Sequence, residues 1–170
     1  MSEPIPRPSR AVLPRKDRPT LTEGGREALD LARYAPFLLN AVSSAWNRET
    51  SAIYRARFGF GIGEWRVLAM VAVAPDIRQQ RICAELRMNK SAASRSLALL
   101  KDKGLLEAHG EARRALWRLT DEGARVHAEV MEIALGWEAK MLEGVAPEDL
   151  STFLAVMARM LENLERGDGD

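Results

Sequence analysis

The residues from Lys90 to Lys103 carry the clearest chemical pattern in this sequence. At about 100° per residue, the repeat of an α-helix, small, polar and basic side chains fall on one arc and apolar side chains on the other. The first arc consists of Lys90, Ser91, Ser94, Arg95, Ala98 and Lys101, and the second of Ala93, Leu97 and Leu100. Small side chains let a helix approach base edges, and an arginine can bind a guanine through two hydrogen bonds. The pattern favours a DNA-reading helix over an ordinary amphipathic surface helix.

A second predicted helix, from about Gln79 to Leu86, precedes this one at the spacing of a helix-turn-helix. Only Arg87, Met88 and Asn89 separate the two. Asn89 is a favourable N-cap, and an exposed helix N-terminus favours a phosphate. We therefore add Gln79, at the start of the first helix, to the predicted DNA-binding residues.

A predicted β-hairpin follows the reading helix. Leu105 to Ala108 and Arg114 to Leu119 flank a short polar link that contains Gly110. Arg113 and Arg114 then lie at the tip of a thin ribbon, which can enter a minor groove or contact the DNA backbone. Paired arginines at a turn are also common on solvated surfaces, and the preceding helix is what favours a DNA contact.

The charge distribution agrees with this interpretation. Residues 78–118 contain ten Lys or Arg against four Asp or Glu, whereas residues 119–170 contain four basic against twelve acidic residues. The first region suits phosphates and the second repels them.

The remaining sequence predicts helices on both sides of this lobe. We expect a disordered, basic and Pro-rich arm over residues 1–25, a helical dimerisation region over 26–57 and 121–166, a DNA-binding lobe over 58–120, and a tail over 167–170. Pro36 leaves two alternatives, a helix that starts there or a kinked helix. Thr120 can cap a helix that runs to about Glu143, and Pro147 starts a last helix that ends near Arg166.

The last predicted helix carries a broad apolar stripe, which a small monomer cannot cover. Its members are Phe153, Leu154, Val156, Met157, Met160, Leu161 and Leu164. A second copy of the chain is the expected cover, and two reading helices related by a two-fold axis require a pseudo-palindromic site on double-stranded DNA.

Several other classes of protein lack support in the sequence. The single cysteine, Cys83, excludes an internal disulfide framework, and His109 and His127 are the only histidines, so no metal site is expected. No Gly-rich phosphate loop, His-x-x-x-His motif or paired nucleophile and base occurs, so we expect neither an enzyme nor a cofactor, with a small helical enzyme as a distant alternative. The absence of a long apolar stretch favours a cytoplasmic protein that binds no membrane.

From Phe58 to Gly123 the sequence resembles the MarR family of regulators. The matching elements are Phe58-Gly59, Glu64-Trp65-Arg66-Val67-Leu68, Lys90-Ser91-Ala92-Ala93-Ser94-Arg95, Lys103-Gly104-Leu105, the acid-x-Arg-Arg tip and Leu119-Thr120-Asp121-Glu122-Gly123. The resemblance extends over roughly residues 32–164. It implies a mainly helical fold with a small β-hairpin wing, a winged helix-turn-helix in a homodimer whose terminal helices entwine. It also implies a transcription regulator, commonly a repressor released by a small ligand.

Two features depart from the family pattern. Arg87 occupies the turn position where the family usually has glycine, so the residue takes either a strained left-handed conformation or a different turn geometry. The hairpin is shorter than is common in the family. Cys83 leaves a redox-sensing regulator as an alternative, but its position is usually a small buried residue, which favours an inert thiol.

A small aromatic acid or its coenzyme A thioester is the expected effector, and a ligand-independent regulator is the alternative. The predicted site combines polar and aromatic residues of the first, second and fifth helices: Arg33, Tyr34, Asn40, Trp65, Arg66 and His127. A carboxylate ligand would use an arginine or protonated histidine beside an aromatic wall. For each residue a purely structural role competes, with Trp65 as core and Arg66 paired with an acidic neighbour.

Overall fold

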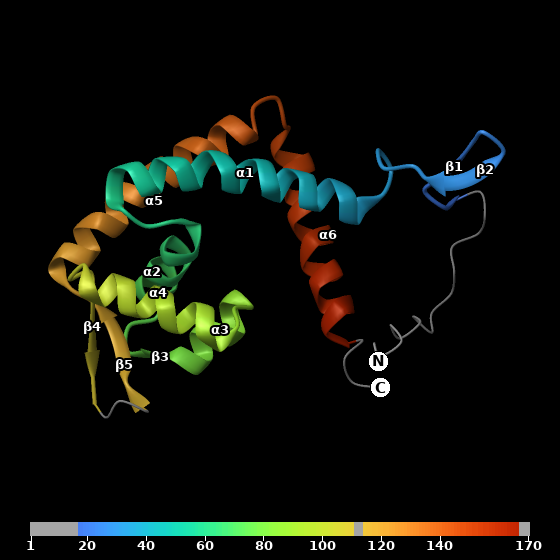
Figure 1. The fold of residues 1–170 in the computed structure, drawn as a ribbon. Coiled ribbons are helices and arrows are strands. Elements are labelled where there is room, and N and C mark those ends of the chain that lie inside the picture. The colour runs from blue at the N-terminus through green and yellow to red at the C-terminus, as the bar shows by residue number, and fades with distance from the viewer. Residues whose placement is uncertain (1–16, 111–113, 167–170) are drawn as a thin grey trace. The chain divides into compact units, whose positions relative to one another are not determined.

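The structure, a computed structural model, describes residues 17–110 and 114–166. The chain divides into two compact units, residues 1–49 and residues 50–170. The helices are α1 (Ala35–Phe58), α2 (Ile62–Val73), α3 (Gln79–Leu86), α4 (Lys90–Asp102), α5 (Asp121–Met141) and α6 (Pro147–Arg166). The strands are β1 (Thr20–Glu23), β2 (Arg26–Leu29), β3 (Ile77–Arg78), β4 (Leu106–His109) and β5 (Leu116–Leu119) (Figure 1). This is the mainly helical fold with a small β-hairpin that the sequence predicted.

The first unit contains a β-hairpin that we did not predict. β1 and β2 are antiparallel, with Thr20 opposite Leu29 and Glu23 opposite Arg26. The turn is Gly24-Gly25, and both residues have positive φ, +58° and +75°. Two-residue hairpin turns need positive φ, which glycine adopts at little cost. The expected disordered arm is therefore wrong for residues 20–25, and the expected helical region is wrong for residues 26–29, which form β2. Residues 1–16 lie outside the described part.

The first helix begins at Ala35, with Pro36 in its first turn. Proline is tolerated there because the first backbone N–H groups of a helix have no partner within the helix. Of the two alternatives, the structure agrees with a helix that begins around Pro36 and holds the proline in its first turn.

The core of the second unit lies among the end of α1, helices α2 to α5 and the strands β3, β4 and β5. Its fully buried side chains include Tyr54, Leu68, Ile82, Leu97, Leu100 and Leu106. Strands β3, β4 and β5 form a sheet in the order β3-β5-β4, in which both pairs are antiparallel. β3 was not predicted because two residues are too few to produce a periodic pattern. The sheet and the apolar face of α4 share one core, so α4 and the hairpin are held together.

Helices α5 and α6 complete the second unit. The Thr120 hydroxyl caps α5 by accepting the Gly123 N–H at 2.9 Å. α6 begins at Pro147 and ends at Arg166, as expected. No residue of α6 is buried, although the helix carries the predicted apolar stripe. None of the helices in the described ranges has the length and hydropathy needed to cross a membrane.

Candidate nucleic-acid interface

Helix α4 presents the polar arc to solvent. Lys90, Ser91, Ser94, Arg95, Ala98 and Lys101 are all exposed. Ala93, Leu97 and Leu100 are buried, with at most 1% of each residue exposed. The Asn89 side chain caps the helix by accepting the Ala92 N–H at 2.8 Å. The predicted division between a packed face and a free face is confirmed.

The turn between α3 and α4 is closed by Arg87 in the left-handed conformation, with φ +51° and ψ +42°. The alternative of a different turn geometry is wrong. The Met88 N–H binds the Cys83 carbonyl at 3.0 Å, which ends α3 as a glycine in this position would. The Arg87 guanidinium then reaches Glu165 of α6 at 2.5 Å. A non-glycine residue in this conformation costs about 1 to 2 kcal/mol.

A cavity of about 370 Å³ lies beside the N-terminus of α4, lined by Gln79, Gln80, Cys83 and Lys90. The Gln79 amide donates to the Lys90 carbonyl at 3.1 Å and so joins the starts of α3 and α4. The N-cap of α3, Arg78, gives its helix no side-chain hydrogen bond. Cys83 is half-buried and borders this cavity, not fully buried as expected, because α3 packs through Ile82.

The hairpin formed by β4 and β5 is present with the predicted strands. Arg114 is exposed at the start of the returning segment, and Arg113 lies outside the described residues. Farther down, Arg118 lies 3.5 Å from Asp76, just before β3, and 3.5 Å from Glu107 of β4, so its charge is largely balanced by these two carboxylates. Of the described arginines on this hairpin, Arg114 is therefore the one best placed for a phosphate.

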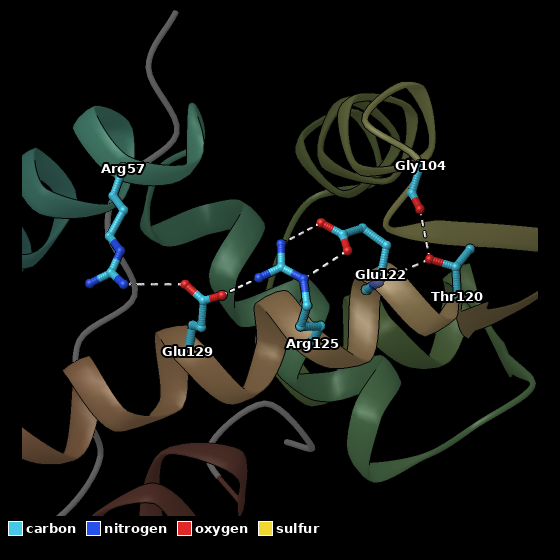
Figure 2. A network of polar contacts seen from close by, with 7 residues as sticks. Arg57, Gly104, Thr120, Glu122, Arg125 and Glu129 are labelled. Carbon is cyan, nitrogen blue, oxygen red and sulfur yellow. Dashed lines mark hydrogen bonds and ion pairs between the residues drawn. The ribbon is translucent and has the colours of Figure 1, made fainter.

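A polar network holds the base of the hairpin to the neighbouring helices (Figure 2). Arg125 binds both Glu122 and Glu129 on its own helix, and Glu129 also binds Arg57 of α1 at 3.3 Å. The hydrogen bond from Arg125 lowers the pKa of the Glu122 carboxyl below its ordinary value. At the other end, the Thr120 hydroxyl donates to the Gly104 carbonyl at 2.6 Å. The network fixes the start of α5 beside the last turns of α1.

One polar contact of the reading helix escaped the sequence analysis. Ser96 lies on the buried face of α4, with 3% of the residue exposed. Its hydroxyl donates to the Glu64 carboxylate of α2 at 2.7 Å. The signal available in the sequence was a serine in the apolar arc, adjacent to Leu97.

The predicted effector residues are only partly brought together. The Trp65 and His127 rings lie 5.3 Å apart between centroids, and Tyr54 lies 6.2 Å from Trp65. Burial lowers the pKa of His127. Arg66 donates to the Leu86 carbonyl at 2.6 Å, so its described partner is a main-chain carbonyl and not the acidic neighbour of the alternative interpretation.

The other three predicted effector residues, Arg33, Tyr34 and Asn40, belong to the first unit. The sequence analysis missed Tyr54, whose buried hydroxyl has no hydrogen-bond partner among the described residues. Over the same ranges, no group of His, Cys, Asp and Glu side chains could hold a metal ion.

Comparisons with known proteins agree with this architecture. A MarR family model matches residues 58–115, which include the helix-turn-helix and the first strand of the hairpin, β4. Among solved structures, a MarR/EmrR family transcriptional regulator from Acinetobacter sp. ADP1 is 23% identical with a TM-score of 0.74, over 80% of this chain and 98% of that one. A MarR family transcriptional regulator from Silicibacter pomeroyi DSS-3 is 26% identical with a TM-score of 0.67, over 79% and 97%.

A third solved structure, a MepR–DNA complex from S. aureus, is 18% identical with a TM-score of 0.69, over 77% of this chain and 96% of that one. A search of curated proteins found no match. The matched segment carries the exposed face of α4, and the fold extends over most of each solved relative. The chain thus matches the MarR family model over its helix-turn-helix, and its fold is similar to that of solved MarR family regulators.

Proposed function

We propose that the chain is a DNA-binding transcription regulator and not an enzyme. The observation that carries the proposal is the exposed face of α4, on which Arg95, Ser91 and Ser94 stand free of protein partners among the described contacts while the opposite face is buried. A helix of this kind fits the major groove, where arginine and serine side chains can bind base edges.

The surroundings of α4 add contacts for the DNA backbone. The cavity beside Lys90 carries one ammonium group, two carboxamides and the uncapped N-terminus of α3, all of which can donate to a phosphate. Arg114 of the hairpin and Lys101 at the end of α4 are exposed. Backbone contacts of this kind position the protein but do not specify the sequence.

Titration of labelled duplex DNA at several salt concentrations tests this function. We expect affinity to fall steeply as salt rises, because each neutralised phosphate releases counterions. The same titration with single alanine variants of Lys101 and Arg114 should give shallower salt slopes, with losses nearly equal for all sequences. Binding that is absent at low salt, or independent of salt, would contradict the proposal.

We further propose that the regulator acts as a homodimer through α6. Phe153, Leu154 and Leu164 are 51%, 58% and 73% exposed, although an apolar face of this extent normally lies against a partner. The same face in a second copy is self-complementary about a two-fold axis. Such a dimer would present two copies of α4 to a pseudo-palindromic site.

Sedimentation at micromolar concentration tests the dimer. Wild type should sediment as a dimer and Leu154→Asp as a smaller species, because a buried carboxylate without a partner opposes association. Thr152→Asp is a control of equal charge on the same helix, at a position outside the apolar stripe. A wild-type monomer, or equal behaviour of the two variants, would contradict this assignment.

The regulator is proposed to repress transcription until a small aromatic acid, or its coenzyme A thioester, binds near Tyr54, Trp65 and His127. Two features support this: the neighbouring rings of Trp65 and His127, tilted by 31° to each other, offer an aromatic wall, and the Tyr54 hydroxyl is a buried donor without a described partner. An effector can act only by binding the DNA-competent and incompetent arrangements unequally.

Calorimetry with benzoate, cinnamate and their coenzyme A thioesters tests the effector. Heat of binding in wild type, weakened about tenfold by the loss of the hydroxyl in Tyr54→Phe, is the expected result. No heat with any of these compounds, together with unchanged DNA affinity in their presence, would remove the effector proposal and leave DNA binding intact.

A further inference from the structure

Glu64 connects the first turn of α2 to the middle of the reading helix. One carboxylate oxygen, Oε2, accepts the Gly61 N–H at 3.0 Å, at the start of its own helix. The other, Oε1, accepts the Ser96 hydroxyl at 2.7 Å. Because each oxygen has its own donor, the first contact fixes the direction in which the second points. Hydrogen bonds to an ionised carboxylate are stronger than those between neutral groups.

The contact lies where α4 otherwise packs by apolar side chains alone. Ala93, Leu97 and Leu100 fill the buried face, and Ser96 is the one buried polar residue of α4. Apolar packing is not directional, whereas a hydrogen bond weakens as its angle departs from linearity. Of the contacts described on the buried face, the Ser96 hydrogen bond is therefore the directional one, and its loss leaves rotation of α4 about its axis opposed by apolar packing alone.

Rotation of α4 would misplace the side chain beside Ser96, which is Arg95. A helix with its side chains has a radius of about 5 to 6 Å, so a rotation of about 10° moves an outer atom by about 1 Å. Recognition sites work only when their groups are held within about 0.5 Å of the productive position. A small rotation is therefore enough to take Arg95 out of register with a base edge.

We propose that Glu64 is a positioning residue for DNA reading, which acts through Ser96 to set the rotation of α4 and the aim of Arg95. The proposal rests on the proposed DNA-binding function and extends it to residues that touch no DNA. Glu64 and Ser96 contribute to the difference in affinity between the preferred sequence and other sequences, and little to the attraction of α4 for DNA in general.

The test compares specific and non-specific binding. The probes are a duplex selected by wild-type protein from a random pool, and an unselected duplex of the same length. The variants are Ser96→Ala, Glu64→Gln and the double variant. We expect each single variant to lower the ratio of selected to unselected affinity by about tenfold, with unselected affinity and salt slope close to wild type. The double variant should be no worse than the poorer single variant, because Ser96→Ala removes the contact and Glu64→Gln weakens the same contact by removing the negative charge.

Ser51→Ala is the matched control. Ser51 is a buried serine of α1, with 7% of the residue exposed, so its loss tests whether removal of any buried hydroxyl lowers the ratio. Glu64→Gln preserves side-chain shape and keeps the test available if Ser96→Ala folds poorly. Circular dichroism checks the fold of each variant below its melting temperature.

The outcomes separate this inference from the proposed function. An unchanged ratio in Ser96→Ala and Glu64→Gln overturns the positioning role, and so does an equal fall in Ser51→Ala. If wild type selects no sequence and binds no duplex, the DNA-binding function fails, and the positioning role with it. A fall in both variants and not in the control supports both.

Discussion

Gly123, the third residue of α5, packs directly against the main chain that leads from α4 into β4. A Cβ atom at this position would lie 1.9 Å from the Leu105 carbonyl oxygen and 2.9 Å from its carbon. An ordinary contact begins at 3.4 Å, so Gly123→Ala requires a displacement of 1.5 Å, the difference between 3.4 and 1.9 Å. The clash is with backbone, and no side-chain rotation can relieve it.

The displacement would strain two hydrogen bonds at the same junction. The Thr120 N–H donates to the Leu105 carbonyl at 3.2 Å, and the Thr120 hydroxyl to the Gly104 carbonyl at 2.6 Å. Overpacking costs about 2 kcal/mol, and each hydrogen bond about 1 kcal/mol. The better helix propensity of alanine offsets about 1 kcal/mol. We therefore expect Gly123→Ala to lower the free energy of unfolding by about 3 kcal/mol.

Urea denaturation followed by circular dichroism measures this change, with all variants at one protein concentration because the stability of a dimer depends on it. Gly136→Ala is the control, since Gly136 lies in the same helix and a Cβ there meets no atom within 4 Å. It should raise stability by about 0.5 to 1 kcal/mol. Equal stability of the two variants would refute the account of the α4–α5 junction.

Three further predictions concern single positions. Arg87→Gly should be more stable than Arg87→Ala by about 1 kcal/mol. Both variants lose the exposed ion pair with Glu165, but only glycine adopts the left-handed conformation without a steric cost. Equal unfolding free energies of the two variants would contradict the proposed backbone strain at this position. Burial lowers the pKa of His127, so its contribution to stability is complete above the ordinary value of 6.5 and is lost as pH falls through the folded-state pKa. His127→Phe should therefore lose less of its free energy of unfolding on acidification than wild type. If the unfolding free energies of the two proteins fell in parallel with pH, protonation of His127 would not be the cause of the loss. Tyr54→Phe should raise the free energy of unfolding by about 1 kcal/mol, because it removes a buried hydroxyl without a described partner, and a destabilised variant would indicate that the hydroxyl is bonded.

The reading helix and hairpin were predictable because their patterns are local. The alternation of Ser94 and Arg95 with Leu97 follows one helical repeat, and Asn89 and Thr120 are caps with known side-chain chemistry. Helix boundaries from Gln79 to Arg166 agreed with the sequence prediction to within a few residues for the same reason.

Contacts between distant segments were not predictable. Glu64 meets Ser96 across 32 residues, and Arg87 meets Glu165 across 78 residues, distances at which the sequence carries no periodic signal. The hairpin at Thr20 to Leu29 was missed for a different reason. The prolines before it favour disorder, whereas the Gly24-Gly25 pair is a local signal for a two-residue hairpin turn.

The central claim is that α4 reads DNA with its exposed face, and Arg95 tests it most directly. The measurement is fluorescence anisotropy of the selected and unselected duplexes with wild type, Arg95→Ala and Arg81→Ala. Arg81 is an exposed arginine of α3, paired with Glu85 at 3.4 Å, and its loss removes the same charge outside α4. Arg95→Ala should lose about 1 to 3 kcal/mol of affinity for the selected duplex and much less for the unselected one, while Arg81→Ala keeps the wild-type ratio. An Arg95→Ala protein that discriminates between the two duplexes as well as wild type would contradict the account.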